Sequence, residues 1–155
     1  MKQANPMQFC VLGATLAVAS ILVALTVVDV TATSQPSRVE REIASSWLSF
    51  KIELSRPTKT APRQFDSNDV QRGSELYQRN CSFCHGSTDR KPGAYAESLS
   101  PRPPQFFRSS PTGPAWRTAY MIRHGVRWTG MPAFAGLTED DTWRIATMLE
   151  TQAGK

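Results

Sequence analysis

The stretch Cys81-Ser82-Phe83-Cys84-His85 lies just past the middle of this 155-residue chain. Two thiols separated by two residues can each add to a vinyl group of a porphyrin, and the histidine that follows can then coordinate its iron. Few other chemistries need all three side chains in this order. The pentapeptide therefore predicts one covalently bound haem c, attached through Cys81 and Cys84, with His85 as an axial ligand of the iron.

Other roles for the pentapeptide are less well supported by the rest of the sequence. A structural zinc site normally needs four ligands, and His124 is the only histidine besides His85. A thioredoxin-like redox pair requires a βαβ setting, whereas the flanking pattern is helical and rich in loops. A plain disulfide between Cys81 and Cys84 stays open as an alternative in an oxidising compartment.

The second ligand of the iron is expected in the turn Gly130-Met131-Pro132. Pro132 restricts the backbone and Gly130 allows close approach, so the thioether of Met131 is the leading candidate. His124 is the rival ligand, but a histidine at a helix end, near free carbonyls, more often has no metal role. Two other methionines, Met121 and Met148, better suit the usual role of methionine, which is to fill a core.

Two further contacts around the haem are expected. His85 should donate its other ring N–H to a backbone carbonyl, and the proline-rich loop after the motif is well placed to supply one. The haem propionates are anionic, and Arg102 is the first choice among the side chains that could donate to them. The other candidates are Trp116, Arg117, Arg127 and Trp128.

An apolar run of 20 residues without charge extends from Phe9 to Val28. As a helix it would cover roughly 30 Å, the hydrocarbon thickness of a bilayer. Lys2 precedes it and Asp29 follows it, which predicts a single-pass anchor in the cytoplasmic (inner) membrane, with the rest of the chain in the periplasm. A signal peptide cleaved near Val30-Thr31-Ala32 is the alternative. The anchor is preferred because signal-peptide apolar regions usually have about 7–15 residues.

Composition divides the chain into a membrane anchor (1–30), a linker (31–65) and a domain that contains the pentapeptide (66–155). The linker has Ser, Thr and Pro at both ends, whereas its middle, 39–54, combines a helical spacing with a strand-like alternation. We leave its secondary structure unassigned. It is either a segment that folds against the domain or a docking surface for a membrane partner.

Three helices are predicted in the last domain. The first starts at Ser67 as its cap and leads into Cys81, the second covers 114–124 and stops at Gly125, and the third starts at Thr138. Gly73, inside the first helix, indicates close approach by another helix. Residues 86–113 are dominated by Pro, Gly and Ser and are expected in loops. A domain with so few apolar helical positions would be only marginally stable alone, and a haem would fill its centre.

The charge distribution argues against nucleic-acid binding. The formal net charge is +5, and the basic residues are spread among acidic ones. Nucleic-acid binding would need lysines and arginines gathered on one face with interleaved aromatic residues, so that class of partner is excluded.

Residues 67–151 resemble class I c-type cytochromes, particularly the single-haem, membrane-anchored bacterial kind. Three blocks agree in order: VQRGSELYQRNCSFCHG, SPRPPQF and AYMIRHGVRWTGMPAFAGLTEDDTWRIATMLE. The resemblance implies an all-α, cytochrome c-like domain with Cys81 and Cys84 as the thioether positions and His85 and Met131 as the axial ligands. It also implies that Gly73 and Tyr77 occupy the crossing between the first and last helices.

The expected function is one-electron transfer. An iron with two protein ligands has no position open to a substrate, so the sequence predicts an electron carrier rather than an enzyme. Its partners would be membrane lipid and redox proteins of the respiratory chain, such as a dehydrogenase or an oxidase. The alternative is a fixed cytochrome c subunit of a larger membrane oxidoreductase or respiratory complex. A haem sensor or peroxidase would require Met131 to leave the iron.

Overall fold

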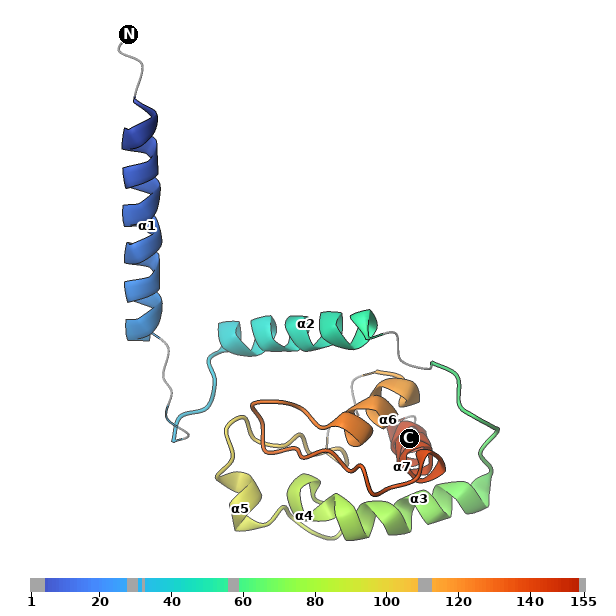
Figure 1. The fold of residues 1–155 in the computed structure, drawn as a ribbon. Coiled ribbons are helices and arrows are strands. Elements are labelled where there is room, and N and C mark those ends of the chain that lie inside the picture. Colours follow the sequence, from blue (N-terminus) through green and yellow to red (C-terminus); the bar gives the residue numbers. More distant parts are fainter. Residues whose placement is uncertain (1–4, 28–30, 32, 56–58, 109–112, 154–155) are drawn as a thin grey trace. The chain divides into compact units, whose positions relative to one another are not determined.

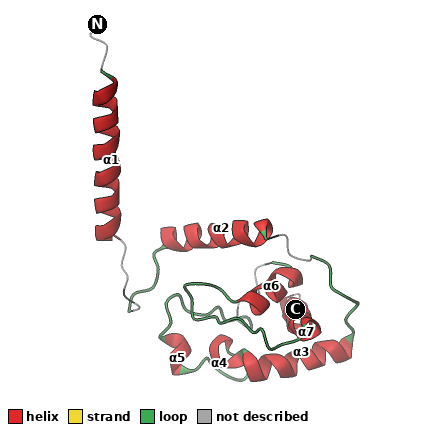
Figure 2. Cartoon of the chain, in the orientation of Figure 1, coloured by secondary structure: helices red, strands yellow, loops and turns green. Residues whose placement is uncertain are grey.

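The computed structural model describes residues 5–27, 31, 33–55, 59–108 and 113–153. Within these ranges the regular elements are all α-helices, joined by loops and turns (Figure 2). The all-α fold class is therefore confirmed. The chain divides into two compact units, residues 1–34 and 35–155 (Figure 1). The predicted domain boundaries at residues 30 and 65 stay a prediction.

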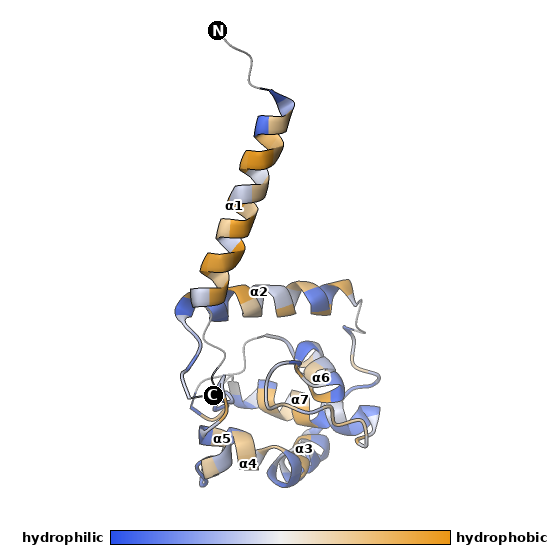
Figure 3. Cartoon of the chain, turned by 60° about the vertical axis from the view of Figure 1, so that its left-hand side comes forward, coloured by the Kyte–Doolittle hydropathy of each residue, from blue (hydrophilic) through white to orange (hydrophobic). Residues whose placement is uncertain are grey.

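The first unit contains α1 (Pro6–Val27), close to the predicted Phe9–Val28. After a hydrophilic start at its amino-terminal end, most of the helix is hydrophobic, with paler residues in between (Figure 3). Among the described residues, only this helix is long and apolar enough to cross a membrane, over Pro6–Thr26. A signal sequence near the amino terminus can pass the same test of length and composition.

The second unit begins with α2 (Arg38–Leu54), in the segment that the sequence left unassigned. Ser37 and Glu40 start it with a capping box. The Ser37 hydroxyl accepts from the Glu40 N–H at 3.3 Å, and the Glu40 carboxylate accepts from the Ser37 N–H at 2.7 Å. Ile52 is buried, and Arg117 donates to the Ser49 hydroxyl at 2.7 Å. This part of the linker is therefore a helix that folds against the domain.

The centre of the second unit is the crossing of α3 (Ser67–Asn80) with α7 (Glu139–Ala153). A Cβ atom placed on Gly73 would lie 2.7 Å from the carbonyl carbon of Arg144 and 3.1 Å from the Cβ of Met148. Both distances are too short for a side chain, so Gly73 is the residue that lets the two helices touch. The close approach predicted from Gly73 is confirmed.

The start of α3 corrects one sequence prediction. The cap is Asp66 rather than Ser67, because the Asp66 carboxylate accepts from the Asp69 N–H at 2.9 Å and the Asp69 carboxylate accepts from the Asp66 N–H at 3.2 Å. Serine and aspartate are both good caps, and the reciprocal bond with Asp69 favours the aspartate. At α7 the Thr138 hydroxyl accepts from the Asp141 N–H at 3.1 Å, as predicted.

A fourth longer helix described in the unit is α6 (Ala115–His124), which packs on α7 and is capped by Gly125. Two single turns complete the fold, α4 (Ser82–His85) and α5 (Ala94–Glu97). The expectation of loops throughout 86–113 is wrong at α5. The main core cluster draws on α3, α6 and α7 together with the cysteine turn, and consists of Leu76, Tyr77, Cys81, Ile122, Ile145, Met148 and Leu149.

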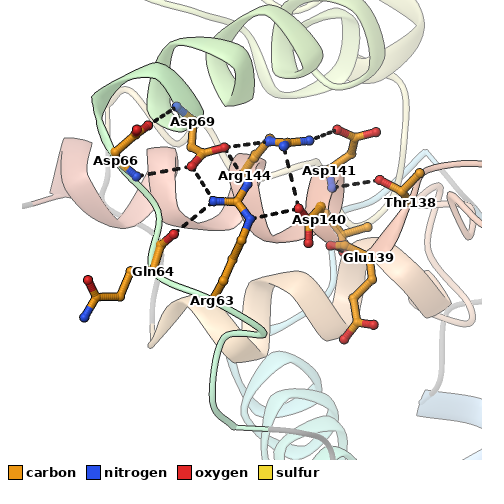
Figure 4. Close-up of polar contacts among 10 residues, drawn as sticks. Arg63, Gln64, Asp66, Asp69, Thr138, Glu139, Asp140, Asp141 and Arg144 are labelled. Atoms are coloured by element: carbon orange, nitrogen blue, oxygen red, sulfur yellow. Dashed lines mark hydrogen bonds and ion pairs between the residues drawn. The ribbon is translucent and has the colours of Figure 1, made fainter.

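An ionic network joins the segment before α3 to both crossing helices (Figure 4). The two terminal nitrogens of Arg63 bond the Asp69 carboxylate at 2.6 and 2.7 Å, and its Nε reaches Asp140 at 3.0 Å. Arg144 donates to Asp69 at 2.9 Å and to Asp141 at 2.8 Å. The bonds from Arg63 first, and then from Arg144, hold the pKa of the Asp69 carboxyl far below its usual range.

Candidate haem site

The pentapeptide forms a tight helical turn directly after α3. The Cys81 carbonyl accepts from the N–H groups of Cys84 and His85 at 3.1 and 2.9 Å, and the Gly86 N–H donates to the Ser82 carbonyl at 2.9 Å. Both cysteines are free thiols, Cys81 buried and Cys84 partly exposed. Burial, with the neighbouring Cys84, raises the pKa of Cys81 to about 12. The turn thus holds two free thiols and an imidazole within one short segment.

The proton of the His85 ring is located by one contact. Its Nδ1 lies 2.8 Å from the carbonyl oxygen of Pro104, which can only accept a hydrogen bond. Nδ1 therefore carries the hydrogen, and Nε2 keeps the lone pair that a metal needs. The carbonyl expected from the proline-rich loop is confirmed and is that of Pro104.

The surroundings of His85 favour its neutral form. Burial lowers the pKa of the imidazole, and the bond to Pro104 opposes this effect only in part. The ring of Phe106 stacks on the imidazole, with 4.6 Å between the ring centroids and 18° between the planes. His85 is therefore held in both tautomer and orientation as a ligand should be.

Gln105 fastens the proline-rich loop to the cysteine turn. Its side-chain amide donates to the carbonyl of Cys84 at 3.2 Å and to that of Pro103 at 3.0 Å. On the other side of the turn, the buried Tyr77 hydroxyl donates to the Gly86 carbonyl at 2.8 Å. Sequence reasoning missed Gln105 and Phe106. The available signal was their place directly after the prolines of the loop expected to face His85.

Met131 lies in a turn that is fixed to the end of α6. Its N–H donates to the Thr129 hydroxyl at 3.1 Å, and its carbonyl accepts from the Val126 N–H at 3.1 Å. Gly125 has φ +68°, and a Cβ there would lie 2.7 Å from the carbonyl carbon of Pro132. The partly buried Met131 side chain packs against the core cluster that contains Cys81, as Phe106 also does. Cys81 and Met131 therefore share one core, and His85 adjoins it through the ring of Phe106.

The remaining candidates lie at the edge of this region or are engaged elsewhere. Arg102 is exposed, and its backbone N–H donates to the Gln35 side chain at 3.2 Å. Arg117 bonds Ser49 of α2, and Trp116 lies 5.0 Å, ring centroid to Nζ, from Lys59. His124 is exposed at the end of α6, 4.4 Å from the ring of Tyr120. The role of Arg102 toward a propionate stays a prediction.

The set of donors suits a haem better than a bare metal ion. In the part of the chain that the structure describes, no three His, Cys, Asp or Glu side chains gather as a metal site requires. The turn instead offers two free thiols and one imidazole with an available Nε2, and a thioether lies on the same core. Thioether attachment and axial ligation by nitrogen and sulfur need this combination.

An all-helical domain built around a Cys-x-x-Cys-His turn defines a c-type cytochrome. The family model for cytochrome c oxidase, cbb3-type, subunit III matches residues 68–149, from the first turn of α3 to near the end of α7. The chain belongs to this family, and its cytochrome c domain serves haem-based electron transfer. The curated proteins contain no match to the chain.

Proposed function

We propose that the protein binds one haem covalently through Cys81 and Cys84, with His85 and Met131 as axial ligands, and carries single electrons on the periplasmic side of the inner membrane. The observation that carries this proposal is the 2.8 Å contact between Nδ1 of His85 and the Pro104 carbonyl. It leaves Nε2 as the free, basic nitrogen of a neutral imidazole, directly beside two free thiols.

When bound, the haem supplies an iron that alternates between its ferrous and ferric states. The Pro104 carbonyl keeps His85 in the ligating tautomer and makes Nε2 more basic. Thr129 and Gly125 hold the Met131 turn, so its thioether has little freedom to leave. A methionine and histidine pair raises the potential and leaves no position for a substrate, which supports a carrier rather than an enzyme.

The proposal also covers the location of the domain, one contact with the haem propionates and the partners in electron transfer. We assign α1 as a retained anchor in membrane lipid, with the haem domain on the exported side. Arg102 lies on the same proline-rich loop as Pro104, with an exposed side chain, and we assign it to a haem propionate. Redox proteins of the respiratory chain are the proposed electron donor and acceptor.

Haem chemistry can be tested on the membrane fraction of cells that express the full chain. We expect a pyridine haemochrome spectrum of the c type, haem that stays with the protein in acidified acetone, and one haem per chain. A redox titration should give a single one-electron step at a potential typical of His/Met ligation. Haem that acetone extracts, or a preparation without haem, contradicts the proposal.

A second candidate is a fixed cytochrome c subunit of a larger membrane oxidoreductase. The observation that favours it is the description of the matching family, a subunit of a cbb3-type cytochrome c oxidase. Purification in mild detergent separates the two candidates. Stoichiometric copurification with oxidase or dehydrogenase subunits supports the fixed subunit, and a lone monomer supports the carrier.

A further inference from the structure

Helix α2 has apolar side chains on two opposite faces. One face is directed to its own unit, and there Ile52 is 2% exposed and Ser49 accepts the bond from Arg117. The other face carries a row of side chains that are each 55–66% exposed, here called the apolar stripe: Val39, Ile43, Trp47, Phe50 and Leu54. At 3.6 residues per turn the stripe covers about 80° of the helix, centred opposite Ile52.

Aromatic rings and a lysine give the apolar stripe the character of a membrane interface. The rings of Trp47 and Phe50 lie together, 5.7 Å between centroids, and the Lys51 Nζ lies 6.0 Å from the Trp47 ring. Tryptophan is enriched where lipid headgroups meet acyl chains, and a lysine can extend its ammonium group back to water from there. A shallow hollow beside the stripe is lined by Glu42, Ile43, Ser46, Trp47 and Phe50.

The charges of α2 show what kind of contact the stripe can make. Three basic and three acidic side chains balance one another: Arg38, Arg41 and Lys51 against Glu40, Glu42 and Glu53. Binding to anionic lipid by charge needs an excess of basic residues, which α2 does not have. A contact through the stripe must therefore depend on apolar burial, as in helices that lie in the plane of the membrane interface.

The length of the connection to α1 limits where α2 can lie. Ten residues, 28–37, separate the last residue of α1 from the first of α2. Even a fully extended connection of this length reaches at most about 40 Å. When α1 spans the bilayer, the first residue of α2 therefore lies within that distance of the surface at which α1 emerges.

We propose that α2 lies on the periplasmic surface of the bilayer that α1 spans, with the apolar stripe inserted at the boundary of headgroups and acyl chains. The inference rests on the proposed function in one respect, since it takes α1 to be a retained anchor. A bilayer explains the stripe, the aromatic pair and the short connection together, whereas a second copy of this chain or another protein would explain only the stripe.

The same placement orients the haem domain toward the membrane. Gln35, just before α2, donates to the Leu99 carbonyl and accepts from the Arg102 N–H, both at 3.2 Å. Farther along, Ser49 is bonded to Arg117 of α6. These contacts tie α2 to the loop and the helix that flank the haem site. A helix fixed on lipid by one face and on the domain by the other would hold the domain in one orientation instead of on a free tether.

Nitroxide labelling of the full-length, haem-loaded protein tests this arrangement. Single cysteines are introduced by Phe50→Cys on the apolar stripe, Ser45→Cys away from it and Leu16→Cys in α1. Each protein also carries Cys10→Ala, which removes the free, exposed cysteine of α1. The proteins are reconstituted in vesicles of phosphatidylcholine, and power saturation compares the accessibility of each label to oxygen and to a water-soluble nickel chelate. We expect the oxygen-to-nickel ratio at position 50 to exceed that at position 45 several-fold, without any need for anionic lipid.

The three positions keep the possible failures apart. A high oxygen-to-nickel ratio, typical of lipid (lipid-type), at position 16 with a low ratio, typical of water (water-type), at position 50 overturns the placement of α2 and leaves the anchor intact. A water-type ratio at position 16 overturns the anchor and the inference with it. A label at position 50 that is shielded from both reagents indicates a protein on the stripe and also overturns the inference. Nitroxide labelling of the Cys10→Ala protein without an added cysteine would instead contradict covalent haem attachment, because Cys81 and Cys84 would then be free to react. A label at Ile43→Cys, also on the apolar stripe, must give the same type of oxygen-to-nickel ratio as the label at Phe50→Cys.

Discussion

Met131 is the residue whose replacement tests the axial ligation most directly. In the oxidised Met131→Ala protein we expect loss of the sulfur-to-iron absorption band near the red end of the visible spectrum. The midpoint potential should also fall, because the thioether ligand raises it. Met148→Leu is the matched control. Met148 is buried at the α3–α7 crossing, and this substitution should cost less than about 1.5 kcal/mol and keep the band. A band that survives in Met131→Ala contradicts the assignment.

Gly125 tests whether the backbone around Met131 is as constrained as its contacts indicate. Its φ of +68° disfavours any side chain, and an added Cβ would meet the Pro132 carbonyl carbon at 2.7 Å. We expect Gly125→Ala to lower the free energy of unfolding by about 1–3 kcal/mol, measured by guanidinium titration in detergent, and to weaken the sulfur-to-iron band. Gly136→Ala is the control, because no atom beyond the two neighbouring residues lies within 4 Å of a Cβ at that position. Equal effects at the two glycines would contradict the account.

Residues that bind through their own chemistry could be predicted from the sequence, and those that act through the backbone could not. Covalent attachment of a haem would require the spacing of Cys81, Cys84 and His85, and that spacing is local in sequence. The partner of His85 is a backbone carbonyl, which any residue possesses, so the sequence indicated a loop and the structure was needed to identify Pro104. The side chain of Gln105 bonds two further carbonyls, and its residue type alone gives no sign of that role.

Among the elements, the crossing of α3 and α7 depends on the missing side chain of Gly73. Alanine would favour the isolated helix by about 1 kcal/mol. Its Cβ would nevertheless collide with the backbone of Arg144, and overpacking costs up to about 3 kcal/mol. We expect Gly73→Ala to lower the free energy of unfolding by about 2 kcal/mol. Ser74→Ala, at the exposed neighbouring position, should leave stability nearly unchanged or raise it slightly. A neutral Gly73→Ala would show that the helices can separate without cost.

The secondary structure of α2 escaped prediction for a physical reason. A helix with one apolar face gives a clear period of 3.6 residues, but α2 has an apolar stripe on one side and Leu48 and Ile52 on the other. Superposed, the two faces make Leu48, Phe50, Ile52 and Leu54 alternate as a strand would. The capping box at Ser37 and Glu40 was the signal that favours a helix there.

The ionic network around Asp69 predicts how stability depends on pH. A carboxyl whose pKa is lower in the folded chain contributes stability that is complete above its unfolded pKa of about 3.9. That contribution is lost as the pH falls from there toward the folded pKa, because the unfolded chain takes up the proton first. In Arg63→Met the Asp69 pKa should move up. The loss of stability between about pH 5 and pH 2 should then be shallower than in the unmodified protein.

The matched control for the network is the same substitution at Arg72. This residue pairs with Glu75 at 2.8 Å on the exposed side of α3, with about half of each side chain exposed. Exposed pairs of this kind contribute little, and Arg72 makes only the smallest contribution to the pKa of Asp141, so Arg72→Met should change the pH dependence of unfolding far less than Arg63→Met. If the free energy of unfolding fell equally steeply at acidic pH in Arg63→Met and in the unmodified protein, the Arg63 bonds would not shift the titration of Asp69.

For the molecule as a whole, the decisive question is whether α1 remains on the mature protein. Its 22 residues exceed the usual signal-peptide apolar region, and they fit the thickness of a bilayer. We therefore expect protein purified from membranes to yield peptides from α1 and, from the same chains, a peptide containing Cys81 and Cys84 with haem attached. Mass spectrometry of the intact and digested protein measures both. The haem-loaded protein should also stay on the membranes when they are washed with high salt, because apolar burial rather than charge holds the chain there.

A mature chain that begins near Thr33 would contradict the anchor while leaving the haem site untouched, and the protein would then be an exported carrier without a membrane span.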